Sequence, residues 1–182
     1  MPMKTLLLQL TTRVGLLVPG QALADSPLVP PRVKEVWSPN KQFCAVMKPK
    51  AMTTTVYRID KDGRRARSWA MHGWFRVANL ADDGEHLIAG HDGVNLLPLG
   101  VTKNEPMIRF FRRGELIKTV RLGELLKDLS HLQRTVSHYF WGDYLGLDKR
   151  GRYVVETVEN RRLAFDISTG RLVAHDRDVR HR

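Results

Sequence analysis

The stretch W-S-P-N-K-Q-F-C-A-V at residues 37–46 joins a polar turn to an apolar strand. The same order returns twice, in N-L-A-D-D-G-E-H-L-I-A at residues 79–89 and in G-L-D-K-R-G-R-Y-V-V at residues 146–155. Each copy is followed by a second predicted hairpin, whose turn contains Gly63, Gly114 or Gly170. Repeated units of about four strands are typical of β-propellers. The sequence therefore predicts a mostly-β fold of about three propeller-like blades of antiparallel strands.

The last unit contains the clearest strand, L-A-F-D-I at residues 163–167. Leu163, Phe165 and Ile167 alternate with Ala and Asp, so they share one face, and we predict that this face lies in the core. Closed propellers usually have about four to eight blades, so three blades predict a partial or open propeller. Either the stack stays open, or a helix, the N-terminal linker or another copy of the chain covers its edges.

One segment between the second and third units departs from the strand pattern. Its leucines recur at helical spacing, at positions 122, 125, 126, 129 and 132. This spacing predicts one amphipathic helix of about three turns over Leu122 to Leu132, inserted before the last unit. Such a helix more commonly covers the end of a sheet than docks a partner.

The N-terminal residues have the pattern of a secretory signal. Lys4 precedes apolar stretches, and Ala22-Leu23-Ala24 places small residues where a signal peptidase cleaves, so residues 1–24 are predicted to be removed after Ala24. The apolar stretch, interrupted by Arg13, is too short to span a membrane, and no transmembrane segment is predicted in the mature chain. We therefore expect a periplasmic or secreted protein. The alternative is an uncleaved leader on a cytosolic protein.

The rest of the sequence divides into three parts. Residues 25–36 contain three prolines in a polar setting and are predicted to form an extended linker. Residues 37–174 are predicted to form a single β-repeat domain, and residues 175–182 a basic tail. The chain has one cysteine, Cys44, which allows no internal disulfide and lies in an apolar strand, where a buried side chain is expected.

The stretch at residues 37–45 resembles the W-S-P-D-G-x-x-[IL]-A repeat of periplasmic β-propellers, such as the Tol-associated propeller of Gram-negative envelopes. Asn40 and Lys41 stand where that repeat has Asp and Gly. Residues 82–89 keep the acidic turn with its glycine and the following strand, and residues 149–154 keep the glycine and the strand. In that family these residues make blade turns and blade cores. The resemblance therefore implies a noncatalytic scaffold that binds a ligand or a protein.

The densest polar cluster of the sequence lies at residues 82–92. Carboxylates and imidazoles this close in sequence are candidates for a metal site or for acid–base chemistry, with His86, His91 and Asp92 as the candidate ligands. Asp82-Asp83-Gly84 and His91-Asp92-Gly93 also have the composition of two turns around a strand, and turn chemistry is the favoured interpretation. The sequence contains none of the common catalytic or phosphate-loop motifs, and no cofactor is predicted.

An aromatic run is a first candidate for a binding surface. Tyr139, Trp141 and Tyr144 have the residue types that line a groove for a sugar or a peptide. Such a run is more typical of the core between two blades. The sequence alone leaves both interpretations open.

A second candidate surface is basic, in keeping with a formal net charge of +11. It consists of basic residues at or beside predicted turns: Arg64, Arg65, Arg67, Arg112 and Arg113, with further clusters at Lys149, Arg150, Arg152, Arg161 and Arg162. Solvated turns that aid solubility are the favoured interpretation of these residues, and a binding surface is the alternative. A positive surface attracts anionic partners. Because the signal segment directs the chain away from nucleic acid, anionic envelope polymers or lipid head groups are the better candidates.

Together these features predict an exported, noncatalytic β-repeat scaffold or binding protein of the bacterial cell envelope, whose partner is a protein or an anionic envelope component. Two alternatives stay open. One is a small envelope hydrolase or metal-binding protein that uses the cluster at residues 82–92. The other is a binder of anionic envelope polymers through the arginines beside the turns.

Overall fold

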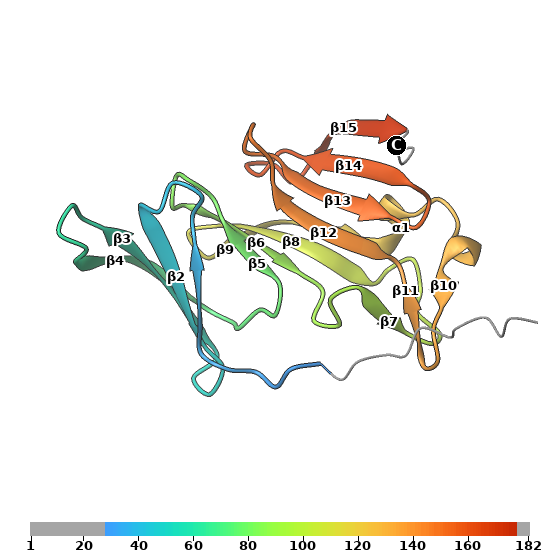
Figure 1. The fold of residues 1–182 in the computed structure, drawn as a ribbon, viewed down its shortest axis with the longest axis horizontal. Helices are drawn as coiled ribbons and strands as arrows, with labels where there is room; N and C mark the ends of the chain where they lie inside the picture. Colours follow the sequence, from blue (N-terminus) through green and yellow to red (C-terminus); the bar gives the residue numbers. More distant parts are fainter. Residues whose placement is uncertain (1–27, 178–182) are drawn as a thin grey trace, which may run out of the picture.

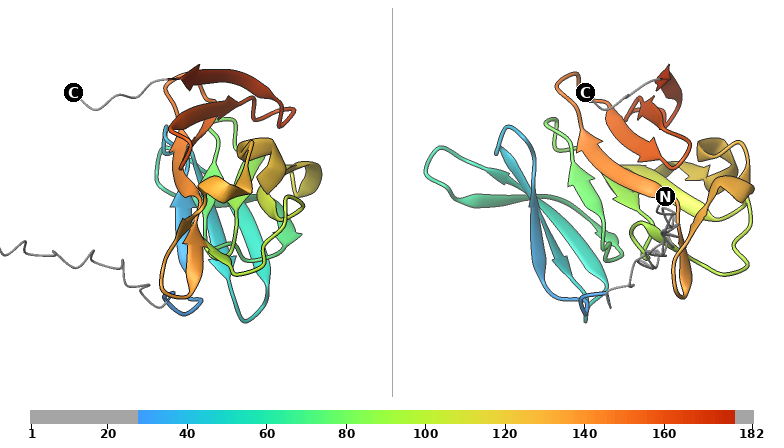
Figure 2. Two further views of the ribbon diagram at one scale, coloured as in Figure 1. Left: turned by 90° about the vertical axis from the view of Figure 1, so that its right-hand side faces the viewer. Right: turned by 45° about the vertical axis from the view of Figure 1, so that its right-hand side comes forward.

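A computed structural model of the chain describes residues 28–177, which form three blades of antiparallel strands and one smaller sheet (Figure 1). The described part is mostly β, as predicted, with one short α-helix. The right-hand view in Figure 2 shows the blades in the order of the chain, with the middle blade between the other two. The predicted signal segment and residues 178–182 of the predicted tail lie outside the described residues.

Each blade is a four-stranded antiparallel sheet. The strands of blade 1 are β1 (Lys34–Trp37), β2 (Phe43–Lys48), β3 (Thr53–Ile59) and β4 (Arg65–His72). The strands of blade 2 are β5 (Ala78–Leu80), β6 (His86–Gly90), β8 (Pro106–Arg112) and β9 (Glu115–Arg121). The strands of blade 3 are β12 (Gly142–Leu147), β13 (Tyr153–Thr157), β14 (Arg161–Phe165) and β15 (Leu172–Arg177). The prediction of three repeated units is confirmed.

The terminal strands extend beyond the predicted domain limits at both ends. β1 begins at Lys34, within the predicted linker, because Lys34 pairs with Met47 of β2. β15 ends at Arg177, within the predicted tail, because it pairs with β14 as far as Arg161. Pairing with a neighbouring strand, which local composition does not reveal, sets these limits.

A fourth sheet of three strands is absent from the sequence prediction. Its order is β10-β11-β7, and its strands are β7 (Leu96–Pro98), β10 (Gln133–Arg134) and β11 (His138–Phe140). It joins the connection between β6 and β8 to the segment that precedes blade 3. Trp141 follows β11, is fully buried, and donates a hydrogen bond from Nε1 to the carbonyl oxygen of Val94 at 3.0 Å.

The first turns of the three blades lie together at one end of the stack. Asn40, in the turn between β1 and β2, donates from its backbone N–H to Asp82 Oδ1 at 2.7 Å and from Nδ2 to the Asp82 carbonyl oxygen at 2.9 Å. The three turns share one left-handed position, which Lys41 occupies with φ 61°, Gly84 with φ 67° and Gly151 with φ 72°. The repeated sequence thus builds three equivalent turns.

Blade 2 is packed on both faces. Phe110 and Phe111 are neighbours on β8 and therefore point to opposite sides of the sheet. Phe110 belongs to core cluster 1 between blades 2 and 3, with Ile108, Trp141, Tyr153, Leu163 and Phe165 among its members. Phe111 belongs to core cluster 2 between blades 1 and 2, with Ala45, Met47, Val56, Trp69 and Leu87 among its members.

The predicted core face of the last unit is confirmed. Leu163 is fully buried, Phe165 is 2% exposed, and Ile167 packs against core cluster 1. Ala164 points to the opposite face of β14. The alternation read from the sequence therefore separates the inner and outer faces of blade 3.

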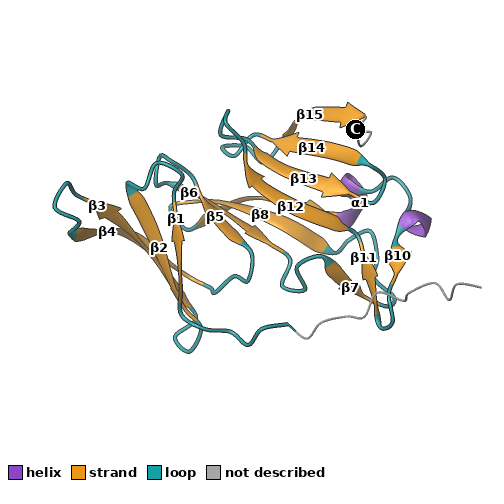
Figure 3. Cartoon of the chain, in the orientation of Figure 1, coloured by secondary structure: helices purple, strands orange, loops and turns teal. Residues whose placement is uncertain are grey.

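The helix before blade 3 is present but much shorter than predicted, as Figure 3 shows. The structure has a single α-turn, α1 (Leu122–Leu125), and a 3-10 turn, η1 (Leu129–His131). The backbone N–H groups of Lys127 and Asp128 donate to Glu159 Oε1 at 2.9 and 3.1 Å, where a continuous helix would direct them to its own carbonyls. Within residues 28–177, no helix has the length and apolar character needed to cross a membrane.

Tyr153→Phe is expected to raise the free energy of unfolding by about 1 kcal/mol. The Tyr153 hydroxyl is buried in core cluster 1 and has no hydrogen-bond partner among the described residues, so folding removes it from water without compensation. Urea unfolding of the two proteins measures the difference.

Tyr144→Phe is the matched control. The Tyr144 hydroxyl accepts from the His91 backbone N–H and donates to the Met107 carbonyl oxygen, both at 2.8 Å. This variant is expected to lose about 1–3 kcal/mol, because it leaves two partners unsatisfied. Destabilisation of the same size in both variants would show that the Tyr153 hydroxyl is also satisfied.

Candidate binding surfaces at the ends of the blade stack

Blades 1 and 3 each have one face against blade 2 and one outer face. On the outer face of blade 1, Glu35 and Arg65 form a bidentate ion pair, with N–O distances of 2.7 and 3.0 Å. The Arg65 guanidinium also lies 5.6 Å from the centroid of the Trp37 ring. The charges of Glu35 and Arg65 on this face therefore neutralise each other, and the Trp37 ring packs beside the guanidinium.

Cys44 lies on the same face of β2 and is fully buried, as predicted. Burial, with a further contribution from the Glu35 carboxylate, raises the pKa of its thiol to about 11. The thiol is thus protonated at neutral pH and unreactive. Cys44 serves as a small buried side chain.

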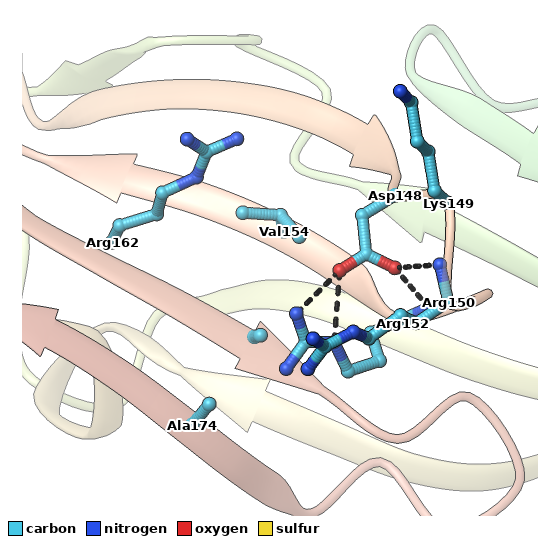
Figure 4. Close-up of a pocket in the computed structure, with 8 residues that line it drawn as sticks. Asp148, Lys149, Arg150, Arg152, Val154, Arg162 and Ala174 are labelled. Carbon is cyan, nitrogen blue, oxygen red and sulfur yellow. Dashed lines mark hydrogen bonds and ion pairs between the residues drawn. The ribbon is translucent and has the colours of Figure 1, made fainter.

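The outer face of blade 3 is hollowed and basic (Figure 4). The blade 3 hollow has a volume of about 490 Å³. Its charged residues are Asp148, Lys149, Arg150, Arg152 and Arg162. Three small apolar side chains complete the lining: Val154 of β13, Ala164 of β14 and Ala174 of β15. The hollow therefore combines an apolar floor with four cations and one carboxylate.

Asp148 organises the turn between β12 and β13 on which most of these cations lie. Its Oδ1 accepts from the backbone N–H groups of Arg150 at 2.8 Å and Arg152 at 2.9 Å. Its Oδ2 accepts from Arg152 Nε at 2.8 Å and pairs with Nη2 at 2.7 Å. Burial by itself would raise the pKa of Asp148, but the hydrogen bonds from Arg152 and Arg150 outweigh it and lower the pKa. Arg152 is thereby held at one edge of the hollow.

The other three cations of the hollow are Lys149, Arg150 and Arg162. Within the described part of the chain, no ion pair joins Lys149, Arg150 or Arg162 to a carboxylate, and all three are exposed. Two acidic residues lie opposite Arg162 in the strand register, Glu156 on β13 and Asp176 on β15. The basic residues of the blade 3 hollow are therefore concentrated at the turn between β12 and β13, and Arg162 has an acidic residue opposite it on each neighbouring strand.

A second hollow of about 440 Å³ lies where the first turns of the three blades meet. Pro39, Asp82, Asp83, Asp148 and Lys149 contribute to its lining. It adjoins the blade 3 hollow through Asp148 and Lys149, which line both. Three aspartates and one lysine contribute its charged groups, so this hollow is acidic where its neighbour is basic.

The polar cluster at residues 82–92 is divided between two turns. Asp83 accepts from the backbone N–H groups of Glu85 and His86 and lies 2.6 Å from His86 Nδ1. His91 Nε2 instead lies 3.3 Å from Glu105, and its Nδ1 accepts from the Gly93 backbone. Asp92 accepts from Arg76 through its carbonyl oxygen. In the part of the chain that the structure describes, no three His, Cys, Asp or Glu side chains are grouped to hold a metal ion.

These contacts also affect the charge of Asp83. Burial would raise the pKa of this carboxyl, but the His86 side chain and the backbone donors outweigh it and lower the pKa. Asp83 is therefore an ionised turn residue. Its hydrogen bonds are those of a turn residue, which is the interpretation that the sequence favoured.

The arginines predicted as a binding surface are mostly paired. Arg112 and Arg113 both contact Glu85, at 3.1 and 2.9 Å, and Arg65 is bound to Glu35. Arg64 lies 3.9 Å from Asp62, and Arg67 is exposed on β4. Four of these five arginines thus lie within 4 Å of a carboxylate, and Arg112 and Arg113 share the same one.

The aromatic candidates belong to the core more than to a surface. Trp141 is fully buried, so its assignment to a binding surface is wrong. Its ring centroid lies 4.9 Å from that of Tyr144, whose hydroxyl is held between His91 and Met107. Tyr139 is half-buried and packs against core cluster 1. The three rings therefore pack in or against core cluster 1 between blades 2 and 3, and Tyr139 reaches it from β11 of the three-stranded sheet.

The sequence already placed Arg162 in a basic cluster beside a predicted turn, and the strand pattern tells which face it occupies. Because side chains alternate along β14, Arg162 shares a face with Ala164 and not with the buried Leu163 and Phe165. The small Val154, Ala164 and Ala174 at adjacent register positions leave the space of the hollow open.

No protein-family model and no curated protein matches the chain. Among solved structures, the C-terminal WD40 domain of Sif2 is similar with a TM-score of 0.37 and 14% identity over 80% of this chain and 39% of that chain. The periplasmic gluconolactonase PpgL of Pseudomonas aeruginosa gives a TM-score of 0.39 and 13% identity over 79% of this chain and 38% of that chain. The chain thus spans about two fifths of the length of each. At these TM-scores the likenesses add nothing to the three-blade description, which rests on the sheets themselves.

Proposed function

We propose that the protein is an exported, noncatalytic binding protein of the bacterial cell envelope. The observation that carries this proposal is the open, hollowed outer face of blade 3. An incomplete stack of blades leaves this face without a covering blade in the described residues, and concave surfaces of this kind are where proteins bind ligands.

The arrangement of the titratable groups supports a binding role over the hydrolase alternative. Asp83 and Asp148 accept hydrogen bonds within their own turns, and His86 and His91 point to different carboxylates. These aspartates and histidines therefore stabilise the turns in which they lie. A stoichiometric transition metal in protein purified from the native cell would favour the alternative instead.

Two features of the sequence support the envelope location. Residues 1–24 have the charge, apolar stretch and small residues of a cleavable signal. The W-S-P-N stretch of the first blade turn resembles the repeat of periplasmic propellers. The single cysteine is buried, so the fold does not depend on a disulfide in either compartment.

Export is tested by the N-terminus of the protein isolated from the native cell. The expected mature chain begins at Asp25 and is recovered in the periplasmic or secreted fraction, because cleavage follows Ala24. N-terminal sequencing of the fractionated protein measures this directly. A chain that keeps Met1 and remains in the cytosol would refute the proposal.

A further inference from the structure

We propose that the end of the blade stack opposite the first turns binds the surface of an anionic lipid membrane. This inference rests on the proposed envelope function and gives it a partner. It starts from three separate segments that expose large apolar side chains at this end, which we call the distal end. These side chains are Leu28, Val29 and Val33 of the linker, Met52 of the turn between β2 and β3, and Leu99 and Val136 of the three-stranded sheet.

The three segments reach the distal end by different routes. β2 leads away from the first turn of blade 1, so the turn between β2 and β3 lies at the opposite end, as Figure 1 and Figure 2 show. The hairpin of β10 and β11 points in the same direction in both figures. Pro98 pairs with His138 beside the tip of this hairpin, so Leu99 lies next to the tip. Residues 28–33 cross the same end from blade 1 toward the hairpin.

The linker segment is held against the fold through its backbone. Trp74 Nε1 donates to the Arg32 carbonyl oxygen at 3.0 Å, and the Arg76 guanidinium donates to the Val29 carbonyl oxygen. These contacts leave the apolar side chains of the segment in solvent. Six of the ten exposed large apolar side chains of residues 28–177 thus belong to the distal end. Single exposed apolar residues are ordinary, but a concentration of them marks a surface that contacts a protein or a membrane.

The same segments are basic. The exposed cations beside the apolar side chains are Arg32, Lys48, Lys50 and Arg134, and the segments at residues 28–34, 48–53, 96–101 and 133–138 contain no Asp or Glu. Within residues 28–177, none of these four cations forms an ion pair with a carboxylate. The strand register places Thr53 opposite Lys48 and Tyr139 opposite Arg134, so no acidic residue faces them across a sheet.

Two exposed carboxylates lie near these segments. Asp92 accepts from Arg76 through its carbonyl oxygen, and Asp143 lies 3.4 Å from the side-chain amide of Asn95. The four exposed cations outnumber them. The distal end therefore combines apolar side chains with an excess of positive charge.

This combination suits an anionic bilayer. Apolar side chains enter the boundary between head groups and acyl chains, while Lys and Arg keep their charged ends at the lipid phosphates. Each cation close to an anionic surface adds to the attraction. Because a bilayer surface is deformable, it can receive apolar side chains from three separate segments at once.

Cosedimentation with vesicles at about 0.15 M salt tests the inference. Vesicles of phosphatidylglycerol in phosphatidylcholine supply an anionic surface, and vesicles of phosphatidylcholine alone supply a neutral one. The unaltered protein is expected to bind the anionic vesicles at least about tenfold more tightly than the neutral ones, because the cations of the distal end are attracted only to the former.

Two double variants separate the apolar and the electrostatic contributions. Met52→Asn/Val136→Gln keeps every charge, and asparagine tolerates the left-handed backbone of Met52, which has φ 47°. Lys50→Gln/Arg134→Gln keeps every apolar side chain. Each variant is expected to bind the anionic vesicles about tenfold more weakly, because burial of apolar area and attraction of cations both contribute.

Matched control variants carry the same kinds of change at the other end of the stack. Leu116→Gln/Val173→Gln removes two exposed apolar side chains beside the turns between β8 and β9 and between β14 and β15. Lys61→Gln/Arg150→Gln removes two exposed cations from turns of blades 1 and 3. Each control is expected to change binding less than about twofold, because charges more than about 8 Å apart are largely screened at this salt. Circular dichroism verifies that every variant is folded.

Several results would overturn the inference. They are no binding of the unaltered protein to anionic vesicles, equal binding to both kinds of vesicle, and equal losses in the control and distal variants. A loss in the Lys50→Gln/Arg134→Gln variant alone would also overturn it, because binding would then need no apolar contact. Sedimentation equilibrium tests a second copy of the chain as the occupant. Self-association that Met52→Asn/Val136→Gln abolishes, without binding to vesicles, would assign the distal end to contact between copies instead.

These outcomes are distinguishable from failure of the export proposal. All variants share one N-terminus, so differences between them report on the substituted residues whether or not residues 1–24 are removed. A protein that binds anionic vesicles through Met52 and Val136 but keeps Met1 in the cytosol refutes export alone. A mature chain that begins at Asp25 and does not bind anionic vesicles refutes the membrane site alone.

Discussion

Replacing Phe165 with alanine is expected to lower the free energy of unfolding by about 3–5 kcal/mol. Phe165 is 2% exposed in core cluster 1, and its ring centroid lies 6.1 Å from that of Phe110. Truncation removes buried apolar surface and leaves a cavity between blades 2 and 3, which closely packed neighbours fill only in part. Urea unfolding of the variant and the unaltered protein measures the loss.

The matched control lies on the neighbouring strand. Val173 of β15 is 53% exposed, so Val173→Ala is expected to change the stability by no more than about 0.5 kcal/mol. A loss below about 1 kcal/mol for Phe165→Ala would mean that this face of β14 does not form the core. That result would contradict the packing of blade 3 on blade 2.

Gly84→Ala is expected to cost about 2–5 kcal/mol, more than a left-handed backbone alone accounts for. Gly84 has φ 67°, a conformation that a β-carbon disfavours by about 1–2 kcal/mol. A β-carbon at this position also meets the ring of Phe43 from blade 1, and such crowding adds about 1–3 kcal/mol. The turn cannot easily move away, because the Gly84 carbonyl oxygen accepts from buried Trp69 Nε1 at 2.7 Å. Urea unfolding again measures the effect.

Gly151→Ala separates the two causes. Gly151 holds the equivalent turn position of blade 3 with φ 72°, but no described atom lies within 4 Å of an added β-carbon. This variant is expected to lose only the conformational part, about 1–2 kcal/mol. Equal losses in the two variants would show that the Phe43 ring does not press on the first turn of blade 2.

The helix shows where a local pattern stops being sufficient. Leu122 and Leu125 are buried as their spacing predicts, but the helix ends after one turn. Its continuation competes with Glu159, which lies more than thirty residues away from Lys127 along the chain and binds the backbone N–H groups of Lys127 and Asp128. The spacing of the leucines predicts which side chains are buried, but it does not predict the contact with the distant Glu159 carboxylate.

The basic candidate residues likewise depend on contacts that the local sequence does not reveal. Arg65 and Arg112 are prominent in the sequence, yet Glu35 and Glu85, from other strands or turns, neutralise them. Arg162 is equally visible in the sequence, and the strand register places Glu156 and Asp176 opposite it. Pairing across a sheet decides which positive charges remain available to a ligand.

The sequence by itself determined the strands, their turns and the inner face of the last blade. These follow from local rules, since alternation assigns Leu163 and Phe165 to one face and Asp-Gly turns reverse the chain at Gly84. The tertiary structure alone decided which blade faces stay open, which arginines are neutralised and where Trp141 is buried. The reason is physical: burial and ion pairing depend on groups brought within a few ångströms by contacts between blades, and those contacts have no signature in any single stretch of the chain.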